Sequence, residues 1–338
     1  MYYVVTPMQG QTDAAEIKPK IDTAGYLRAI GVQPLRFSRF VKQDRFWRDE
    51  IIGMLTAVKA NDTVILQLPT YAGDDVESHI LALLLQNKVR VVALLHDVDY
   101  LRFPQSHPQK PAIDYLNQFA AVMVSTAIER QRLVADGIQA PITVIGPWGY
   151  QQTTDYVRPN YTRMVHYAGN LTALRSGFLA HVPAEMDLQA YGSNDGQPDL
   201  DFVVASNVHL HGVYSQFQLG TAISNGFGLV WDGNLAGQFS EYGLVNMPHK
   251  LSLYLAQGIP VLAKSGTASG TFVKKNHLGF VGDSLADLEA QLQQVGQKQY
   301  DELVTRIALV APLIRNGYTV QRAALSAFAD AASMSLAD

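Results

Sequence analysis

The sequence predicts an α/β protein made of two consecutive Rossmann-like domains, each with a parallel sheet. Short apolar runs alternate with helical patterns along both halves of the chain, and this alternation is typical of parallel sheets covered by helices. The alternation lapses between about residues 146 and 160 into Pro, Gly, Tyr, Gln and Thr, and then restarts. The length of 338 residues suits two domains at about 150 residues each.

The first half begins with an apolar strand over residues 2–6 and a polar loop over residues 7–13. Asp13 is suited to cap the helix that follows, over residues 14–30. The remaining expected strands of this half are residues 64–68, 89–95, 121–125 and 142–145. The expected helices are residues 75–87, 108–119 and 128–136. The run 89–95 is apolar apart from one Arg, as expected of a central strand buried on both faces.

The second half repeats the same architecture. Its expected strands are residues 164–168, 187–192, 227–231 and 259–263, while residues 202–205 are ambiguous. Helices are expected over residues 248–257, where Gly258 takes the C′ position, over 284–294, and twice more near the end. The domains therefore run over residues 1–155 and 156–315, and residues 316–338 form a C-terminal helix for packing or oligomerisation.

The composition excludes several classes of protein. Lys and Arg number 26 against 30 Asp and Glu, a net charge of −4, which argues against a nucleic-acid binder. Cysteine is absent, which excludes disulfides, Cys–zinc sites and thiol catalysis. No stretch reaches the roughly 18 apolar residues of a membrane helix, and the N-terminus lacks the basic start of a secretion signal. We expect a cytoplasmic protein with no membrane span and no nucleic-acid partner.

The strongest local signal is the Gly/Ser/Thr loop over residues 265–271, which contains Thr267, Ala268, Ser269 and Gly270. It follows an expected strand, and ligands of doubly wound sheets lie beyond the carboxyl ends of the strands. Backbone N–H groups and a helix N-terminus at this position suit a phosphate, and Lys250 would add positive charge. An ordinary loop and a solvated lysine are the alternative.

A second group of polar residues follows the first strand of the second domain. Asn170 and Thr172 can hydrogen-bond a ligand, and the planar guanidinium of Arg175 suits a phosphate or a carboxylate. A plain Gly-Asn turn and a surface arginine are the alternative.

In the first domain, His96 and Asp97 follow the buried strand 89–95, and both residue types transfer protons. Asp97 could equally cap a helix or pair with Arg102. The loop with Thr6, Gly10 and Asp13 is expected to admit an acceptor, or to be a plain strand-to-helix connection. We expect no metal at residues 97–99, because only one His lies nearby.

Three stretches carry a resemblance to a known family: residues 167–171, 228–233 and 249–261, with His96-Asp97 and Leu101-Arg102 in support. They resemble the bacterial glucosyltransferases that extend O-linked N-acetylglucosamine on serine-rich-repeat adhesins, a group placed beside galactofuranosyltransferase-like proteins. The resemblance spans most of the chain. It implies the GT-B fold, two Rossmann-like domains facing a central cleft.

The resemblance also implies partners and site residues. The donor is a nucleotide-diphosphate sugar, usually UDP-linked, and the acceptor is a protein with N-acetylglucosamine on Ser or Thr. No cofactor or metal is expected beyond the UDP-sugar co-substrate, and the family tends to be tetrameric. By resemblance, the donor neighbours are Arg175, Lys250, Asn170, Thr172, Tyr214, Ser252, Tyr254, Thr267, Ala268, Ser269 and Gly270.

The family's β-linked product implies inversion, which requires a base for the acceptor hydroxyl: Asp97 or His96, with Asp13 in reserve. Leu253 stands where many GT-B enzymes carry a ribose-binding Glu, so ribose recognition must come from elsewhere. A nucleotide-sugar epimerase or hydrolase, and a non-catalytic nucleotide-sugar-binding partner subunit, are the alternative functions. The sequence does not name the sugar.

Overall fold

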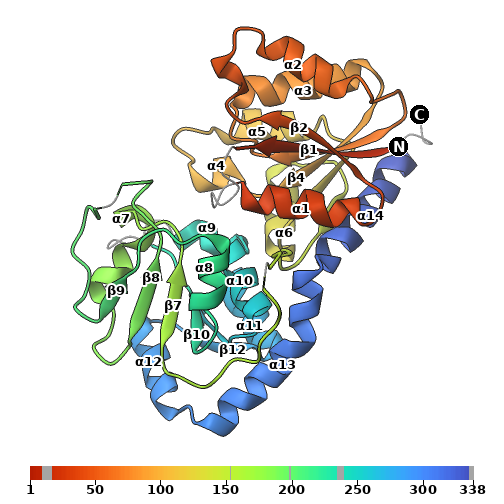
Figure 1. The fold of residues 1–338 in the computed structure, drawn as a ribbon. Helices are drawn as coiled ribbons and strands as arrows, with labels where there is room; N and C mark the ends of the chain where they lie inside the picture. The colour runs from red at the N-terminus through yellow and green to blue at the C-terminus, as the bar shows by residue number, and fades with distance from the viewer. Residues whose placement is uncertain (10–16, 153, 198, 234–239, 335–338) are drawn as a thin grey trace. The chain divides into compact units, whose positions relative to one another are not determined.

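The computed structural model describes residues 1–9, 17–152, 154–197, 199–233 and 240–334 (Figure 1). The chain divides into two compact units. The first unit contains Met1–Gly149 together with Gly317–Asp338, and the second contains Tyr150–Asn316. The cleft expected between two domains involves both units and stays a prediction.

In the described residues, the first unit holds a six-stranded parallel sheet with the order β2-β1-β3-β4-β5-β6. The strands are β1 (Tyr2–Met8), β2 (Gln33–Ser38), β3 (Thr63–Leu68), β4 (Arg90–Leu95), β5 (Ala121–Val124) and β6 (Ile142–Val144). The helices are α1 (Lys18–Arg28), α2 (Trp47–Leu55), α3 (Asp74–Gln86), α4 (Asp99–Arg102), α5 (Gln109–Leu116), α6 (Ala127–Asp136) and α14 (Tyr318–Met334), with a 3₁₀ turn at Val41–Gln43.

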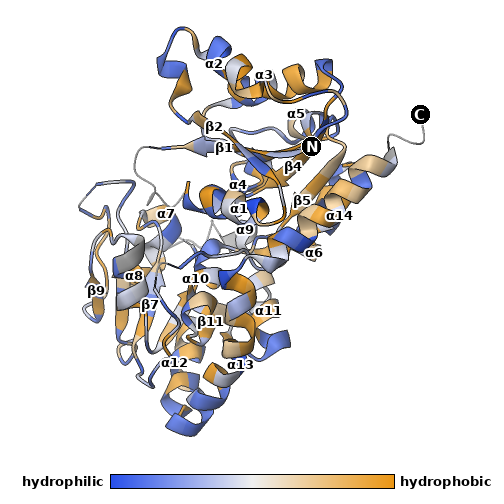
Figure 2. Cartoon of the chain, turned by 45° about the vertical axis from the view of Figure 1, so that its right-hand side comes forward, coloured by the Kyte–Doolittle hydropathy of each residue, from blue (hydrophilic) through white to orange (hydrophobic). Residues whose placement is uncertain are grey.

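The central strands of this sheet are buried on both faces. Every residue of β3 is buried, and so is every residue of β4 after Arg90. Figure 2 shows β4 and β5 in the colour of hydrophobic residues. Because both faces are covered by helices, these strands read as continuous apolar runs, which is why the sequence predicted them.

The elements of the first unit that escaped prediction are β2, α2, α4 and the 3₁₀ turn at Val41–Gln43. β2 lies at the edge of the sheet, alternates between buried and exposed residues, and contains Pro34. An edge strand of this kind has no continuous apolar run. The helix α2 was also missed; of its nine residues, the buried ones are Trp47 and Ile51. The helix expected over residues 14–30 begins at Lys18 among the described residues.

The C-terminal helix α14 belongs to the first unit. It packs on α1 and on β4, β5 and β6. Its buried face is a stripe of small side chains, Ala323, Ala324, Ala327 and Ala331. Small residues let a helix approach a sheet closely, so residues 317–334 complete the core of the first unit. This differs from the expected division in two ways: the C-terminal segment is part of the first unit, and residues 150–155 belong to the second.

The second unit holds, in its described residues, a six-stranded parallel sheet with the order β12-β11-β10-β7-β8-β9. The strands are β7 (Val165–Ala168), β8 (Leu188–Tyr191), β9 (Val208–Leu210), β10 (Phe227–Val230), β11 (Val261–Lys264) and β12 (Gly279–Gly282). The helices are α7 (Ala173–Ser176), α8 (Gln216–Ala222), α9 (Ser240–Val245), α10 (His249–Gln257), α11 (Ala268–Asn276), α12 (Leu285–Gln294) and α13 (Gln297–Arg315), with a 3₁₀ turn at Gly177–His181.

Local signals explain where helix α10 ends and where helix α11 begins. Gly258 ends α10 with φ of 82°, a left-handed conformation that favours glycine, as predicted. Thr267 caps α11 by accepting a hydrogen bond from the N–H of Gly270 at 2.9 Å. The loop expected over residues 265–271 is therefore shorter, because α11 begins at Ala268. Residues 202–205 form no strand, and the edge strand lies at β9 instead.

Candidate functional site

The strand order of the second unit creates a topological switch point. The chain runs outward from β7 through β8 and β9, and then returns to place β10 on the other side of β7. In doubly wound sheets, ligands bind at the carboxyl ends of the strands beside such a point. The carboxyl ends of β7 and β10 are therefore where a ligand of this unit is expected.

Lys250 lies at this point, in the first turn of α10. Its Nζ donates to Asp232 Oδ1 at 2.8 Å, and to the carbonyl of Trp231 and Oη of Tyr167, both at 3.3 Å. The ammonium also lies 4.4 Å from the centre of the Tyr167 ring. Burial alone lowers the pKa of Lys250, but Asp232 and Tyr167 outweigh it, so the pKa is raised above its usual value. Lys250 is a fixed positive charge.

The loop after β7 brings Asn170, Thr172 and Arg175 to the same place. The Oδ1 of Asn170 accepts the N–H of Thr172 at 2.9 Å, and the carbonyl of Arg175 accepts the N–H of Gly233 at 3.0 Å. A Cβ added to Gly169 would lie 3.5 Å from the Nζ of Lys250. The two groups of residues expected to bind phosphate, one after β7 and one on α10, therefore border one site.

The N-terminus of α11 faces a small cavity of about 20 Å³ beside these residues, lined in part by Asp232, Lys264 and Ser269. The Oγ of Ser269 is buried and has no hydrogen-bond partner among the described residues, and Ser269 is only 2% exposed. The N–H groups of the first helical turn point past the end of the helix. An unpartnered hydroxyl beside a helix N-terminus is an arrangement that an anion can satisfy.

Lys264 was missed by sequence reasoning. It ends β11, and its Nζ lies 5.6 Å from the centre of the Trp231 ring. The sequence did contain a signal for this residue, because Lys264 is a charged residue at the end of a buried parallel strand and directly before the Gly/Ser/Thr loop.

Ser252, Leu253 and Tyr254 lie in the core of the second unit. Ser252 and Tyr254 are 0% exposed, and Leu253 is 3% exposed. The Oη of Tyr254 accepts the N–H of Ala168 at 3.0 Å and donates to the carbonyl of Leu229 at 3.2 Å. The structure therefore places Ser252 and Tyr254 behind the site rather than on its surface. Leu253, which stands where a ribose-binding Glu was expected, also packs in the core.

Tyr214 belongs to an aromatic cluster at the carboxyl ends of β8 and β9. The ring centre of Tyr214 lies 5.2 Å from that of Tyr191, and Tyr191 stacks on His211 at 4.8 Å. The Nε2 of His211 hydrogen-bonds Gln189 Oε1 at 2.8 Å, which fixes the imidazole. Burial raises the pKa of Tyr191 to about 12. Tyr191 and His211 were not expected at the site, because the linear sequence does not show that β8 and β9 are neighbouring strands.

In the first unit, His96 and Asp97 follow β4 as expected. The Nε2 of His96 lies 2.9 Å from Gln67 Oε1, and the ring stacks on Trp148 at 4.7 Å. The amide nitrogen of Gln67 donates to the carbonyls of Val5 and Lys20, so its oxygen accepts from His96. His96 is 7% exposed, so it is buried beneath the carboxyl edge of the sheet and does not lie on its surface.

Asp97 stands nearer the surface and takes part in an ion pair. Its Oδ2 accepts from Arg102 Nη1 at 2.9 Å and from the hydroxyl of Tyr71 at 3.0 Å. Pairing with Arg102 was one of the two alternatives left open by the sequence. A carboxylate held by two donors is fixed in orientation, which a positioned proton acceptor requires.

The residues expected on the acceptor side are only partly described. Thr6 is 1% exposed, and its Oγ1 lies 3.4 Å from the carbonyl of Val4, inside the sheet. Gly10 and Asp13 lie outside the described residues. Thr6 is therefore part of the core rather than of a binding surface.

Two general features bear on partners and cofactors. No helix in the described part of the chain is long and apolar enough to cross a membrane. The same residues contain no group of three or more His, Asp or Glu side chains that could hold a metal ion.

Comparison with family models matches both halves of the chain. Residues 1–147 match the N-terminal domain, and residues 165–327 the C-terminal domain, of glucosyltransferase 3-like proteins. Glucosyltransferase 3 of Streptococcus gordonii is 28% identical over 280 residues, covering 81% of either chain. Glucosyltransferase 3 of Streptococcus parasanguinis is 25% identical over 273 residues, covering 80% of this chain and 79% of that protein.

The fold has counterparts among solved structures. The crystal structure of HepE from Anabaena, in complex with UDP and glucose, superposes with a TM-score of 0.66 at 12% identity, covering 97% of this chain and 99% of that one. This likeness shows the fold alone. With both halves matched by one family, the chain belongs to the glucosyltransferase 3-like family and has the GT-B fold of glycosyltransferases.

Proposed function

We propose that the chain transfers a hexose, glucose or N-acetylglucosamine, from a UDP-sugar to N-acetylglucosamine-modified Ser or Thr of a serine-rich-repeat adhesin. The observation that carries the donor half of this proposal is the meeting of Lys250, the turn that contains Arg175 and the α11 N-terminus at the switch point of the second unit. The names of the streptococcal relatives support a hexosyl transfer.

The diphosphate is the part of the donor that this site suits best. The charge of Lys250 is balanced by Asp232 at 2.8 Å, so this pair alone is neutral. Arg175, Lys264 and the α11 N-terminus supply the additional positive potential that two phosphates require. Charge stabilisation of the leaving diphosphate by these groups takes the place of a bound cation, so we propose that no metal is needed.

The aromatic cluster provides for the rest of the nucleotide. Tyr191, His211 and Tyr214 form a rigid set of rings at the edge where β8 and β9 end. A planar base can stack on such rings without a sequence-specific contact. We assign the uracil to this cluster. Ribose recognition then falls to polar groups between the cluster and Lys250.

Proton transfer is assigned to the first unit. Asp97 is the base that takes the acceptor hydroxyl proton, with Arg102 and Tyr71 holding its carboxylate in place. His96 supports the strand end through Gln67 and Trp148 instead of acting on substrate. Inversion at the anomeric carbon needs one such base, and a carboxylate at the end of a parallel strand meets that need.

The proposal is tested by UDP release from a panel of UDP-sugars, with and without a peptide carrying Ser-linked N-acetylglucosamine. Release that depends on the glycopeptide is expected, and the active donor names the sugar. Release without the peptide would indicate a hydrolase, and conversion of one UDP-sugar into another without release of UDP would indicate an epimerase. UDP binding with no release from any donor would indicate a non-catalytic partner subunit.

A further inference from the structure

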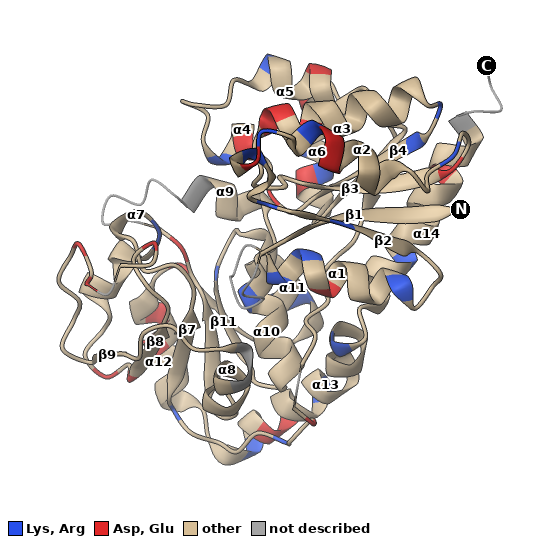
Figure 3. Cartoon of the chain, turned by 45° about the horizontal axis from the view of Figure 1, so that its top comes forward, with Lys and Arg blue, Asp and Glu red and all other residues tan. Residues whose placement is uncertain are grey.

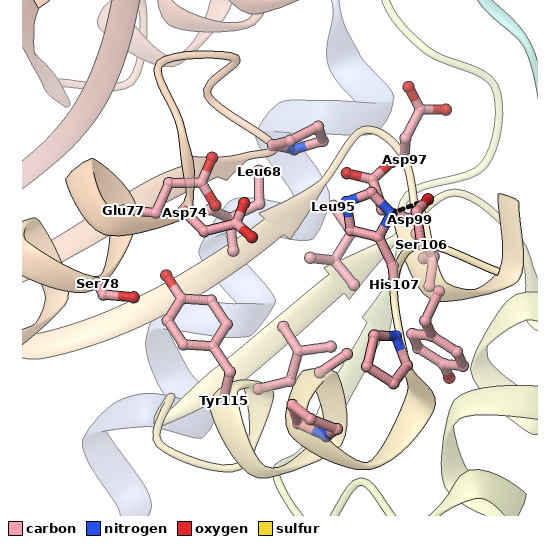
Figure 4. A pocket seen from close by; sticks show the side chains of 17 residues that line it. Leu68, Asp74, Glu77, Ser78, Leu95, Asp97, Asp99, Ser106, His107 and Tyr115 are labelled. Carbon is pink, nitrogen blue, oxygen red and sulfur yellow. Dashed lines mark hydrogen bonds between the residues drawn. The ribbon is translucent and has the colours of Figure 1, made fainter. Parts of the chain in front are cut away.

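A cavity of about 330 Å³ lies within the first unit, between α3 and α5, at the carboxyl ends of β3 and β4 (Figure 4). Its volume falls in the range of sites for small molecules, about 300–1,000 Å³. Leu68, Leu95, Pro108 and Pro111 provide apolar walls. Asp97, the proposed base, lines the same cavity. The cavity therefore belongs to the sheet edge where the acceptor is expected.

Glu77 presents an oxygen to this cavity from a buried position. Its side chain is carried by the first turn of α3, and the residue is 8% exposed. The Oε1 of Glu77 accepts the backbone N–H and the hydroxyl of Thr70. The other oxygen, Oε2, has no hydrogen-bond partner among the described residues. Oε2 is therefore available to accept a hydrogen bond from a ligand in the cavity.

Tyr115 presents a donor from the opposite wall. Its Oη is buried and has no hydrogen-bond partner within the described chain. Figure 4 shows the hydroxyl pointing to the side of the cavity where α3 carries Asp74, Glu77 and Ser78. Burial, and then the charges of Glu77 and Asp74, raise the pKa of Tyr115. The hydroxyl therefore keeps its proton and can donate it to a ligand.

The charge of the cavity narrows the class of ligand. Acidic residues gather where α3 begins and on α4 (Figure 3), and Asp74, Asp97 and Asp99 line the cavity together with Glu77. Carboxylates repel phosphates and other anions. No group of three or more acidic or His side chains in the described residues is arranged to hold a metal ion. A neutral molecule with several hydroxyl groups can donate to these carboxylates, while its C–H faces pack on the apolar walls.

We propose that this cavity binds a sugar ring of the acceptor, with Glu77 Oε2 and the Asp74 carboxylate accepting from ring hydroxyls and the Tyr115 hydroxyl donating to the ring. The proline-rich wall of α5 lies against the C–H face of the sugar. Naming the ring as the acceptor's N-acetylglucosamine rests on the proposed function. The assignment of the cavity, of its hydrogen-bond acceptors and of its donor does not depend on the proposed function.

The test is binding of methyl β-N-acetylglucosaminide to the full chain without a donor, followed by NMR titration. Glu77→Gln keeps Oε1 for Thr70 but turns the Oε2 position into a donor, and Tyr115→Phe removes the hydroxyl. Each change is expected to raise the dissociation constant about tenfold or more, as loss of a buried hydrogen bond to a charged or unpaired group does. The same variants should raise the KM for a glycosylated acceptor and leave UDP affinity unchanged.

Matched controls come from the same unit. Glu129 is more deeply buried than Glu77 and accepts the N–H and the hydroxyl of Ser125 in the same manner, but it does not line the cavity. Tyr3 donates its hydroxyl to the carbonyl of Ala57 at 3.2 Å. Glu129→Gln and Tyr3→Phe should therefore leave saccharide binding at the wild-type level.

Three results would overturn the assignment. They are the absence of saturable saccharide binding by the folded wild type, binding that both cavity variants retain, and a preference for a simple amine over the sugar. If Glu77→Gln does not fold, Tyr115→Phe, which changes no charge, tests the assignment of the cavity by itself. If the wild type binds the saccharide but transfers no sugar, and both variants lose this binding, the result would contradict the proposed function and support the assignment of the cavity.

Discussion

Glu77 and Glu129 occupy equivalent positions in two strand-to-helix connections of the first unit. Each carboxylate accepts a backbone N–H and a hydroxyl, from Thr70 and Ser125 respectively. Burial raises the pKa of both side chains to about 7, against the hydrogen bonds, which lower it. The two glutamates differ in one respect: Glu77 faces a cavity, and Glu129 is enclosed.

The raised pKa of Glu129 predicts a pH dependence of stability. A folded-state pKa near 7 against 4.5 means that the folded chain binds the proton more tightly. The stabilisation is present at low pH and is lost as pH rises from about 4.5 through 7, by up to about 3 kcal/mol. Chemical denaturation from pH 5 to 8 should show the wild type losing stability relative to Glu129→Gln. A difference that does not change with pH would contradict this.

Tyr254 is predicted to act on stability rather than on ligand binding directly. Tyr254→Phe leaves the N–H of Ala168 and the carbonyl of Leu229 without the hydroxyl that joins them. The expected loss is about 1–3 kcal/mol in the free energy of unfolding. Thermal denaturation measures it, with Tyr318→Phe as control because that ring is 51% exposed. An unchanged melting temperature would mean that the two bonds carry no net stability.

Single residues also show how far the site could be predicted. Lys250, Arg175 and Asn170 were assigned to one candidate site from the sequence, and the structure brings Lys250 beside the loop after β7 that leads to Asn170 and Arg175. Ser252 and Tyr254 were assigned to the site but lie in the core, because a helix beside a site turns its residues both toward and away from it. Lys264 and Tyr191 were missed because each depends on which strands are neighbours, and a linear pattern does not contain strand order.

At the scale of elements, the start of α11 is the most constrained part of the site. A Cβ on Gly270 would lie 2.1 Å from the carbonyl oxygen of Lys264, which cannot move without shifting β11. Thr267 also uses the N–H of Gly270 for its cap. The helix N-terminus is therefore held against the strand end by a glycine.

Gly270→Ala tests this element. Alanine in place of glycine normally favours a helix by about 1 kcal/mol. Here we expect the opposite: the clash displaces the first turn of α11, lowers the melting temperature and weakens UDP binding together. Calorimetric titration and thermal denaturation measure the two effects. A stabilised variant with unchanged UDP affinity would show that the helix start is not fixed in this way.

The sequence predicted strands and helices correctly where they are buried on both sides. Strands β3, β4 and β10 and helix α10 appear as long apolar or periodic runs with Pro69 or Gly258 at the end. β2 and β9 lie at sheet edges, and each leaves half or more of its residues exposed. Their apolar content is low because only one face packs, so local sequence does not distinguish them from loops.

For the whole molecule, the main consequence of the fold is that the chain's last helix stabilises its first sheet. Ala327 is fully buried in the core that α14 shares with β4 and β5. No local signal in residues 317–334 identifies the sheet on which they pack. The two-domain α/β architecture was predictable from alternation, but this return of the chain to the first unit was not.

Ala327→Glu is expected to destabilise the first unit selectively, because it buries a charge without a partner at a cost of about 3 kcal/mol or more. Hydrogen exchange should accelerate at the amides of β4, β5 and β6 and stay unchanged at β7, β10 and β11. Leu325→Glu is the control, since Leu325 is 56% exposed on the same helix. Equal acceleration in both sheets would contradict the division into two units.

We propose that the switch point of the second unit binds a nucleoside diphosphate through Lys250. Calorimetric titration of UDP into the wild type, Lys250→Ala and Lys275→Ala tests it most directly, since Lys275 is an exposed lysine at the far end of α11. We expect saturable binding to the wild type and Lys275→Ala, and at least about tenfold weaker binding to a folded Lys250→Ala. Equal UDP affinity in all three proteins would contradict it.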